Sequence, residues 1–252
     1  MPLAKPDIRI VGDAEELSQA GAEEFVSRAA EAVRAQGLVT VALSGGSTPQ
    51  AMFQRLASDA LRDRVAWDKV HVFWGDERHV SPDHPESNYR MAHEALLSKV
   101  PVPAAHVHRI KTENPDASQA ADEYARELRA FFRLGAGHVP RFDLVLLGMG
   151  PDGHTASLFP GTEAVHEHTR LVAAPWVEKF NTYRVTLTPP VLNNATSIIF
   201  LIGGEDKAEA LWAVLEGDHH PDRFPSQVIR PIRGTLVWLV DRRAARLLRP
   251  TG

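Results

Sequence analysis

The stretch VTVALSGGSTPQAMFQRLASDA, residues 39–60, decides the fold. Its first part, Val39–Leu43, is a short continuous apolar run, which is typical of a buried β-strand. Its last part, Pro49–Ala60, has apolar residues at helical spacing and predicts a helix. A strand that runs through a short glycine loop directly into a helix is the repeating unit of α/β proteins with a parallel sheet.

The same alternation of short apolar runs and helical patterns continues along the chain. The other predicted strands are Ile8–Val11, Val70–Trp74, His106–Ile110, Phe142–Leu147, Tyr183–Leu187, Ser197–Ile202 and Thr235–Val240. The other predicted helices are Ala14–Ala35, Ser87–Val100 with Ser87 as N-cap, Ala117–Phe132 and Asp206–Glu216, with a helical turn at Pro189–Asn194 and a short helix after the last strand. We therefore predict an α/β fold with a three-layer, doubly wound, mostly parallel sheet. Strong strands soon follow the loops Gly135–Arg141 and Gly217–Pro225, so we expect residues 1–252 to form a single domain.

Composition excludes several classes of protein. The 252 residues are 44% hydrophobic and 24% charged, which is globular rather than disordered. A net charge of -4 leaves no basic surplus for a nucleic-acid partner, and the absence of cysteine excludes disulfides, thiolate nucleophiles and cysteine-ligated zinc. The longest apolar runs are too short to cross a membrane, and Met1–Asp13 lacks the apolar region of a signal peptide. We expect a cytoplasmic protein with no membrane partner.

Ligands of such sheets bind outside the carboxyl ends of the strands, so the loops that follow the strands are the informative ones. The first follows Leu43 and precedes a predicted helix, for which Ser47 or Thr48 is the expected N-cap. Hydroxyl groups, free backbone amides and the positive end of the helix favour an anion there. The candidate binding residues are Ser44, Gly45, Gly46, Ser47 and Thr48. No Lys-Ser/Thr pair follows the glycines, so this is not a nucleoside-triphosphate loop, and a tight turn that binds nothing is the alternative.

Two further loops bring charged residues to the same predicted edge. Asp76 and Arg78 come directly after the strand that ends at Trp74, and Asn88 opens the next helix. Lys207 lies in the first turn of a predicted helix, where a cation is locally unfavourable unless an anion binds beside it, and Arg184 is a second candidate cation. The alternatives are a solvated turn for the first group and a solvent-facing Lys207 paired with Glu205 for the second.

The remaining loop, Gly148–Ser157, holds the best candidate for a catalytic group. His154 stands among glycines near a predicted helical turn, whose positive end would keep the imidazole neutral and able to accept a proton. Asp152, two residues earlier, is placed to orient or polarise it. The glycines are not followed by the long helix and distant acidic residue of a dinucleotide site, so NAD is not expected. The alternative is a hydrogen-bonded structural histidine.

Neither a metal nor a serine-esterase site is predicted. The paired histidines lack a carboxylate partner in a zinc spacing, and no Gly-x-Ser-x-Gly elbow occurs. The pairs concerned are His106 with His108, His166 with His168, and His219 with His220. We expect neither a metal nor an organic cofactor.

These loops together resemble the 6-phosphogluconolactonase family, which is grouped with the glucosamine-6-phosphate isomerases. The matching segments, in family order, are Leu43–Pro49, Phe73–Arg78, Ser87–Tyr89, Gly148–Gly161, Arg184–Thr188 and Gly203–Lys207. The resemblance implies hydrolysis of 6-phospho-D-glucono-1,5-lactone to 6-phosphogluconate in the oxidative pentose phosphate pathway. It also implies a fold shared with glucosamine-6-phosphate deaminase and ribose-5-phosphate isomerase.

The resemblance assigns roles to the candidate residues. It implies that His154 is the catalytic base and that the Ser44–Thr48 loop holds the substrate phosphate together with Arg184 and Lys207. It places Asp76 and Arg78 beside the sugar or the phosphate end of the bound substrate. The implied partner is a small phosphorylated sugar lactone; the sequence leaves the oligomeric state open, and a monomer is compatible with it.

Two alternative functions stay open. Glucosamine-6-phosphate deaminases continue the histidine segment with Asn-Glu-Pro, where this chain has Ser157–Pro160 without an acid, and carry Asp-Glu-Tyr at Asp76–Arg78. Both departures favour the lactonase. A non-catalytic sugar-phosphate sensor would need the phosphate loop but not His154.

Overall fold

A six-stranded parallel sheet forms the centre of the molecule. The computed structural model describes residues 7–249, and the strand order is β1-β10-β9-β5-β2-β3. The strands are β1 (Asp7–Val11), β2 (Val39–Leu43), β3 (Val70–Trp74), β5 (Leu144–Leu147), β9 (Ser197–Ile202) and β10 (Thr235–Asp241). All five pairings are parallel, so the predicted α/β fold with a mostly parallel sheet is confirmed.

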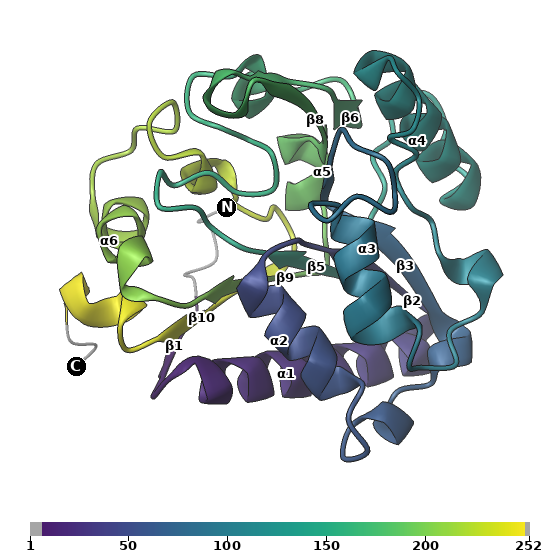
Figure 1. Ribbon diagram of the computed structural model, residues 1–252, viewed down its shortest axis with the longest axis horizontal. Coiled ribbons are helices and arrows are strands. Elements are labelled where there is room, and N and C mark those ends of the chain that lie inside the picture. The colour runs from purple at the N-terminus through teal and green to yellow at the C-terminus, as the bar shows by residue number, and fades with distance from the viewer. Residues whose placement is uncertain (1–6, 250–252) are drawn as a thin grey trace.

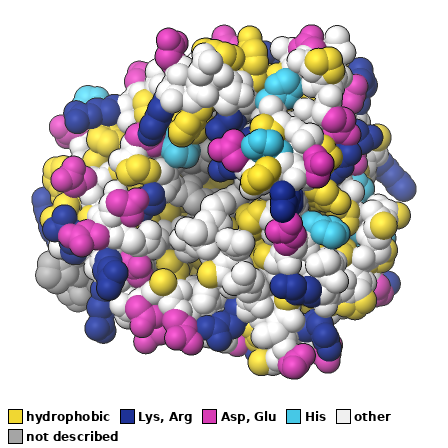
Figure 2. Space-filling view, viewed as in Figure 1, with side chains coloured by type: hydrophobic (Ala, Val, Ile, Leu, Met, Phe, Trp, Pro, Cys, Tyr) yellow, Lys and Arg dark blue, Asp and Glu magenta, His cyan; other side chains and the backbone are white. Residues whose placement is uncertain are grey.

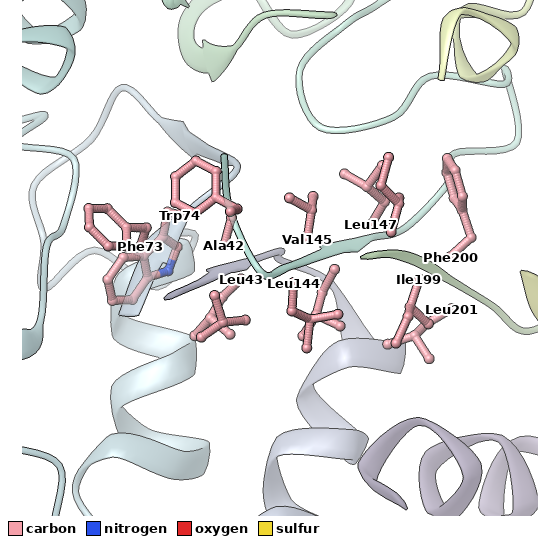
Figure 3. Close-up of a cluster of buried hydrophobic side chains, with 14 of the residues drawn as sticks. Ala42, Leu43, Phe73, Trp74, Leu144, Val145, Leu147, Ile199, Phe200 and Leu201 are labelled. Carbon is pink, nitrogen blue, oxygen red and sulfur yellow. The ribbon is translucent and has the colours of Figure 1, made fainter. Parts of the chain in front are cut away.

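Helices and a smaller sheet cover the two faces of this sheet (Figure 1). On one face lie α1 (Ala14–Gln36) and α2 (Ser47–Leu56), while α4 (Ala117–Phe131) and α5 (Pro189–Asn193) lie on the other. Figure 3 shows why both faces are covered: Val145, Leu147 and Phe200 point to one side, and Ile199 and Leu201 to the other. Every residue of β2, β5 and β9 is buried, as expected for a sheet packed on both faces.

A second, antiparallel sheet was not expected from the sequence. It contains β4 (Asp76–Arg78), β8 (Thr182–Leu187) and β6 (Val172–Ala173), with β7 (Trp176–Val177) paired to β8. The strand predicted at Tyr183–Leu187 is therefore present, but outside the parallel sheet. Gly75 joins the two sheets, because its amide donates to the Leu43 carbonyl (2.8 Å) and its carbonyl accepts from the Leu187 amide (2.8 Å).

Three predicted elements differ in form. No strand forms at His106–Ile110, because the chain turns at Ala104–His106 and only Val107 bridges to Val72. The helix predicted at Ser87–Val100 is α3 (Asn88–Ala92) followed by a π-helical turn, His93–Leu97, and its predicted N-cap is confirmed since Ser87 accepts from the Arg90 amide. The helix predicted at Asp206–Glu216 starts as a 3₁₀ turn, Glu205–Lys207, before α6 (Ala208–Glu216).

Part of the N-terminal segment Met1–Asp13 lies outside the described residues, as do residues 250–252. The extent of the single domain across 1–252 therefore stays a prediction. Within residues 7–249, no helix has both the length and the apolar character needed to cross a bilayer.

A cluster of histidines lies against the edge strand β3. The His71 Nδ1 is 3.1 Å from His108 Nε2, the His108 Nδ1 is 2.8 Å from Glu127 Oε1, and the His71 ring stacks on His106 with centroids 3.9 Å apart. Burial, together with the neighbouring His106 and His108, lowers the pKa of His71 to about 4. The unfolded chain therefore binds more protons than the folded one at this residue between pH about 6.5 and about 4.

We expect this difference to destabilise the protein in mild acid. As pH falls from about 6.5 towards about 4, protonation of His71 in the unfolded chain draws the equilibrium towards unfolding. In a His71→Phe variant, whose ring would join Phe131 in the same cluster, the free energy of unfolding should fall less over this interval. Urea unfolding of both proteins near neutral pH and in mild acid measures it. Equal losses in the two proteins would show that another group is responsible.

Candidate active site

A cavity of about 330 Å³ opens at the carboxyl ends of the parallel strands. After β2 the chain passes to β3 on one side, whereas β5 leads on to β9 and β10 on the other side. The loops that follow β2 and β5 therefore diverge and leave a crevice, which is the usual ligand position in such sheets. Figure 2 shows this face hollowed near its centre, with cationic, acidic and histidine side chains around the hollow.

The cavity brings together residues from all four predicted loops. Of the predicted site residues, those that line it are Ser44, Gly45, Gly46, Ser47, Thr48, Asp76, Arg78, Asn88, His154, Arg184 and Lys207. Asp152 does not line it and instead contacts the imidazole of His154.

One end of the cavity is the N-terminus of α2. The N-cap is Gly46, in the left-handed region at φ 106°, and no side chain caps the helix. The expectation that Ser47 or Thr48 is the cap is therefore wrong: both lie in the first turn, where backbone amides have no intrahelical acceptor. The hydroxyl of Ser44 is buried and has no hydrogen-bond partner among the described residues. This end of the cavity therefore offers several unsatisfied donors.

Two guanidinium groups lie at the same cavity without a carboxylate to neutralise them. Arg78 on β4 and Arg184 on β8 face each other in the antiparallel register. Arg184 is 8% exposed, and within residues 7–249 neither side chain forms an ion pair within 4.0 Å. Burial and the charge of Arg78 lower the pKa of Arg184. Two converging cations that repel each other are arranged for an anion.

Lys207 also lines the cavity, at the start of the predicted helix. It ends the three-residue 3₁₀ turn that leads directly into α6 and is the N-cap of α6. Its ammonium hydrogen-bonds to Asp206 at 2.7 Å, while Glu205, the partner considered from the sequence, pairs with Arg246. Lys207 is therefore a partly neutralised cation, in contrast to Arg184.

Of the charged residues after β3, Asp76 faces the cavity and Glu77 is buried beside it. The Oδ2 of Asp76 accepts from the Ser157 hydroxyl at 2.7 Å, and its carbonyl accepts from the Asn88 amide side chain at 3.0 Å. Glu77 accepts from the backbone amides of Asn88 and Tyr89, both at 2.7 Å. Burial raises the pKa of Glu77, although these amides oppose the rise. Glu77 thus fixes the start of α3 and places Asn88.

His154 lies in an irregular loop, not at a helix start. The segment from Gly148 to Gly161 contains turns and a single bridge but no helix, so the predicted effect of a helix dipole on the imidazole is wrong. Instead its Nδ1 lies 2.5 Å from Asp152 Oδ1, and Phe159 stacks on the ring at 4.1 Å. Since a carboxylate only accepts, a neutral imidazole carries its proton on Nδ1 and has an acceptor lone pair on Nε2. No described residue hydrogen-bonds to Nε2.

Asp152 is held as a carboxylate. Partial burial opposes its ionisation, but the hydrogen bond and charge of His154, together with the ammonium of Lys179 at 3.1 Å, bring the pKa of Asp152 well below its usual value. The hydrogen bond from Nδ1 to this carboxylate leaves Nε2 as the ring atom that can accept a proton. The pair therefore has the form of a general base and its orienting carboxylate.

Gly150 must remain a glycine for the imidazole to keep this position. A Cβ at residue 150 would lie 2.1 Å from both Nδ1 and Cε1 of His154. We expect Gly150→Ala to fold but to lower kcat roughly a hundredfold, since displacing a catalytic group by about 1 Å has this effect. Steady-state kinetics measures it. The control is Gly75→Ala, whose Cβ would make only an ordinary 3.5 Å contact, and an equal loss in both variants would contradict the explanation.

Several side chains of the site carry no signal in the sequence. Phe159 and Ser157 lie within the matching segment Gly148–Gly161, but no spacing or pattern distinguishes them from their neighbours. Phe180, which lines the cavity, and Lys179, which contacts Asp152, lie 26 and 25 residues beyond His154, and no local pattern links them to it. Within residues 7–249, no cluster of three or more His, Asp or Glu side chains is arranged to hold a metal. Metal independence stays a prediction.

Comparison with known proteins places this arrangement in a family. Residues 12–238 match the family model described as glucosamine-6-phosphate isomerases/6-phosphogluconolactonase. A 6-phosphogluconolactonase of Synechocystis sp. is 45% identical over 224 residues, covering 89% of this chain and 90% of that protein. A 6-phosphogluconolactonase of Nostoc sp. is 40% identical over 94% of this chain and 96% of its own length.

A solved structure agrees with these two relatives. The 6-phosphogluconolactonase of Trypanosoma brucei superposes with a TM-score of 0.86 at 31% identity, covering 97% of this chain and 99% of that one. The resemblance drawn from the loop motifs is thereby confirmed. With most of its length matched, the chain belongs to the glucosamine-6-phosphate isomerase/6-phosphogluconolactonase family.

Proposed function

We propose that this protein hydrolyses 6-phospho-D-glucono-1,5-lactone to 6-phospho-D-gluconate, in the oxidative pentose phosphate pathway of the cytoplasm, without a metal. The observation that carries the proposal is that His154 and the unpaired cation Arg184 line one cavity. A proton acceptor in the same cavity as cations and hydrogen-bond donors suits an ester substrate that also carries a phosphate group. The names of the two cyanobacterial relatives and of the trypanosomal structure support the same substrate.

The phosphate is assigned to the end formed by α2 and the two arginines. There it would accept hydrogen bonds from the amides of Ser47 and Thr48 and from the Ser44 hydroxyl, and it would neutralise Arg78 and Arg184. Lys207 contributes a third cation at this end. With the phosphate fixed, the sugar ring extends across the cavity, past Asp76 and Asn88, towards His154.

The chemistry requires one base and a site for the developing oxyanion. Nε2 of His154 takes a proton from water as the water oxygen attacks C1 of the lactone, and the carbonyl electrons move to the oxygen. When the carbonyl re-forms, the bond from C1 to the ring oxygen breaks and the ring oxygen receives the proton from the imidazolium. Asp152 stabilises the imidazolium between the two steps. In this mechanism, backbone amides of the glycine loops stabilise the oxyanion.

The test compares two products. Freshly generated lactone, added to the protein in a weakly buffered solution, should release protons faster than its spontaneous hydrolysis, while glucosamine 6-phosphate should yield no ammonia. Ammonia release would identify a deaminase instead. If neither reaction is accelerated while the lactone or phosphate still binds, the protein is a sugar-phosphate sensor and the proposal is wrong.

A further inference from the structure

The loop between β7 and β8 brings two side chains to the site from outside the predicted motifs. It forms a 3₁₀ turn at Glu178–Phe180 and reverses at Asn181, whose φ of 50° lies in the left-handed region. Lys179 reaches Asp152, and Phe180 lines the cavity. This loop therefore contacts the carboxylate behind the base and the space where substrate would bind.

Lys179 completes a chain of three groups. One oxygen of Asp152, Oδ1, lies 2.5 Å from His154 Nδ1, and the other, Oδ2, lies 3.1 Å from the Lys179 ammonium. A carboxylate held at both oxygens cannot rotate about its last bond without losing one partner. Lys179 thus fixes the plane of the Asp152 carboxylate, and with it the direction of the hydrogen bond that orients the imidazole.

Phe180 ties the same loop to the rest of the site. Its ring meets Phe159 edge-on at 5.7 Å, and Phe159 stacks on the imidazole. The guanidinium of Arg184 lies 5.1 Å from the centre of the Phe180 ring. One short loop therefore contacts the orienting carboxylate, the ring behind the base and the candidate phosphate cation.

We propose that Lys179 is a positioning residue for lactone hydrolysis, acting through Asp152 to hold the His154 imidazole in line with the substrate. The inference rests on the proposed function, since it assigns Lys179 to the base of that reaction. Folding stability does not explain the ion pair between Lys179 and Asp152. The Lys179 side chain is 56% exposed, and exposed ion pairs contribute little to folding stability.

The charge of Lys179 has a second, measurable consequence. The charged groups around the imidazole are Asp152 at Nδ1 and, lining the same cavity, the cations Arg78, Arg184 and Lys207 and the carboxylates Asp76 and Glu86. Lys179 offsets part of the Asp152 charge. In Lys179→Met that offset is lost, and the acid limb of the kcat/KM profile should move to higher pH.

The experiment uses the full chain with Lys179→Met and Lys179→Arg, and Lys69→Met as the matched control. Lys69 also forms an exposed ion pair, with Asp68, but precedes β3 at the opposite end of the strands. We expect Lys179→Met to lower kcat about tenfold with KM nearly unchanged, as is usual for a group that orients a reacting side chain. Lys179→Arg should restore most of kcat and the wild-type acid limb, and Lys69→Met should match wild type throughout.

A double-mutant cycle separates positioning from general damage. In an Asp152→Asn background, Lys179→Met should cause little further loss, because its route to the imidazole is already gone. Full additivity, a wild-type kcat and pH profile in Lys179→Met, or no rescue by arginine would each overturn the proposal while the wild-type protein still hydrolyses lactone. Failure of the wild-type protein to hydrolyse lactone would instead overturn the proposed function, and this inference with it.

Discussion

His154→Ala should fold normally and lose between about a hundredfold and ten-thousandfold in kcat for lactone hydrolysis, the usual contribution of a general base. The side chain stacks on Phe159 and meets Asp152, but it is not part of the buried core that supports the sheet. KM should change much less, because the phosphate end of the cavity is formed by other loops. Stopped-flow or pH-stat kinetics on fresh lactone, corrected for spontaneous hydrolysis, measures the loss.

The chain offers a matched control for this variant. His166 also places a ring nitrogen 2.5 Å from a carboxylate, that of Asp222, but it is exposed and does not line the cavity. His166→Ala should keep the wild-type rate. A wild-type rate in His154→Ala, or equal losses in the two variants, would contradict the assignment of the base.

Arg184→Met should lower kcat/KM for lactone by roughly 10- to 150-fold, mainly through KM. This range corresponds to the loss of charge-assisted hydrogen bonds worth about 1.5–3 kcal/mol. The same substitution should leave the folded protein at least as stable as wild type. It removes a buried cation that lies opposite Arg78 without a carboxylate partner within 4.0 Å among the described residues.

Thermal unfolding with and without inorganic phosphate tests both the predicted loss of phosphate binding and the predicted stability of Arg184→Met. Phosphate should raise the Tm of wild type and compete with lactone, and it should do neither in Arg184→Met. Arg170→Met is the control, since Arg170 is paired with Glu167 and lies outside the cavity. An unchanged KM in Arg184→Met would move the phosphate to another part of the cavity. A marked loss of stability would show that Arg184 serves the fold.

The inner strands of the main sheet could be predicted because they are buried on both faces. Such strands are continuous apolar runs, as in Val39–Leu43 and Ser197–Ile202, and both were predicted with the correct limits. The second sheet has no such signal. Its strand β4 is three charged residues, Asp76–Arg78, and β6 and β7 have two residues each, so their pairing is decided by tertiary contacts.

The candidate site could be predicted as far as the loops that follow the strands. The rule that parallel strands end at one edge correctly brought Ser44 and His154 into one cavity. The environment of His154 was predicted less well. Glycines and prolines between Gly148 and Gly161 prevent the helix whose positive end was expected to keep the imidazole neutral. Lys179 acts on Asp152 across 27 residues, and exposed lysines are too common for sequence alone to single it out.

Gly75 connects two sheets that carry different parts of the active site. His154 and the free amides at the start of α2 belong to segments that follow strands of the parallel sheet, whereas Arg78 and Arg184 belong to the small sheet. Gly75 hydrogen-bonds to both sheets. The side chains of β4 and β8 can therefore change without moving the base, provided that Lys179 and Phe180 in the β7–β8 loop are kept. Attempts to re-target the enzyme to other phosphorylated sugars should begin with the exposed residues of β8 itself, leaving the loops after β2, β5 and β7 intact.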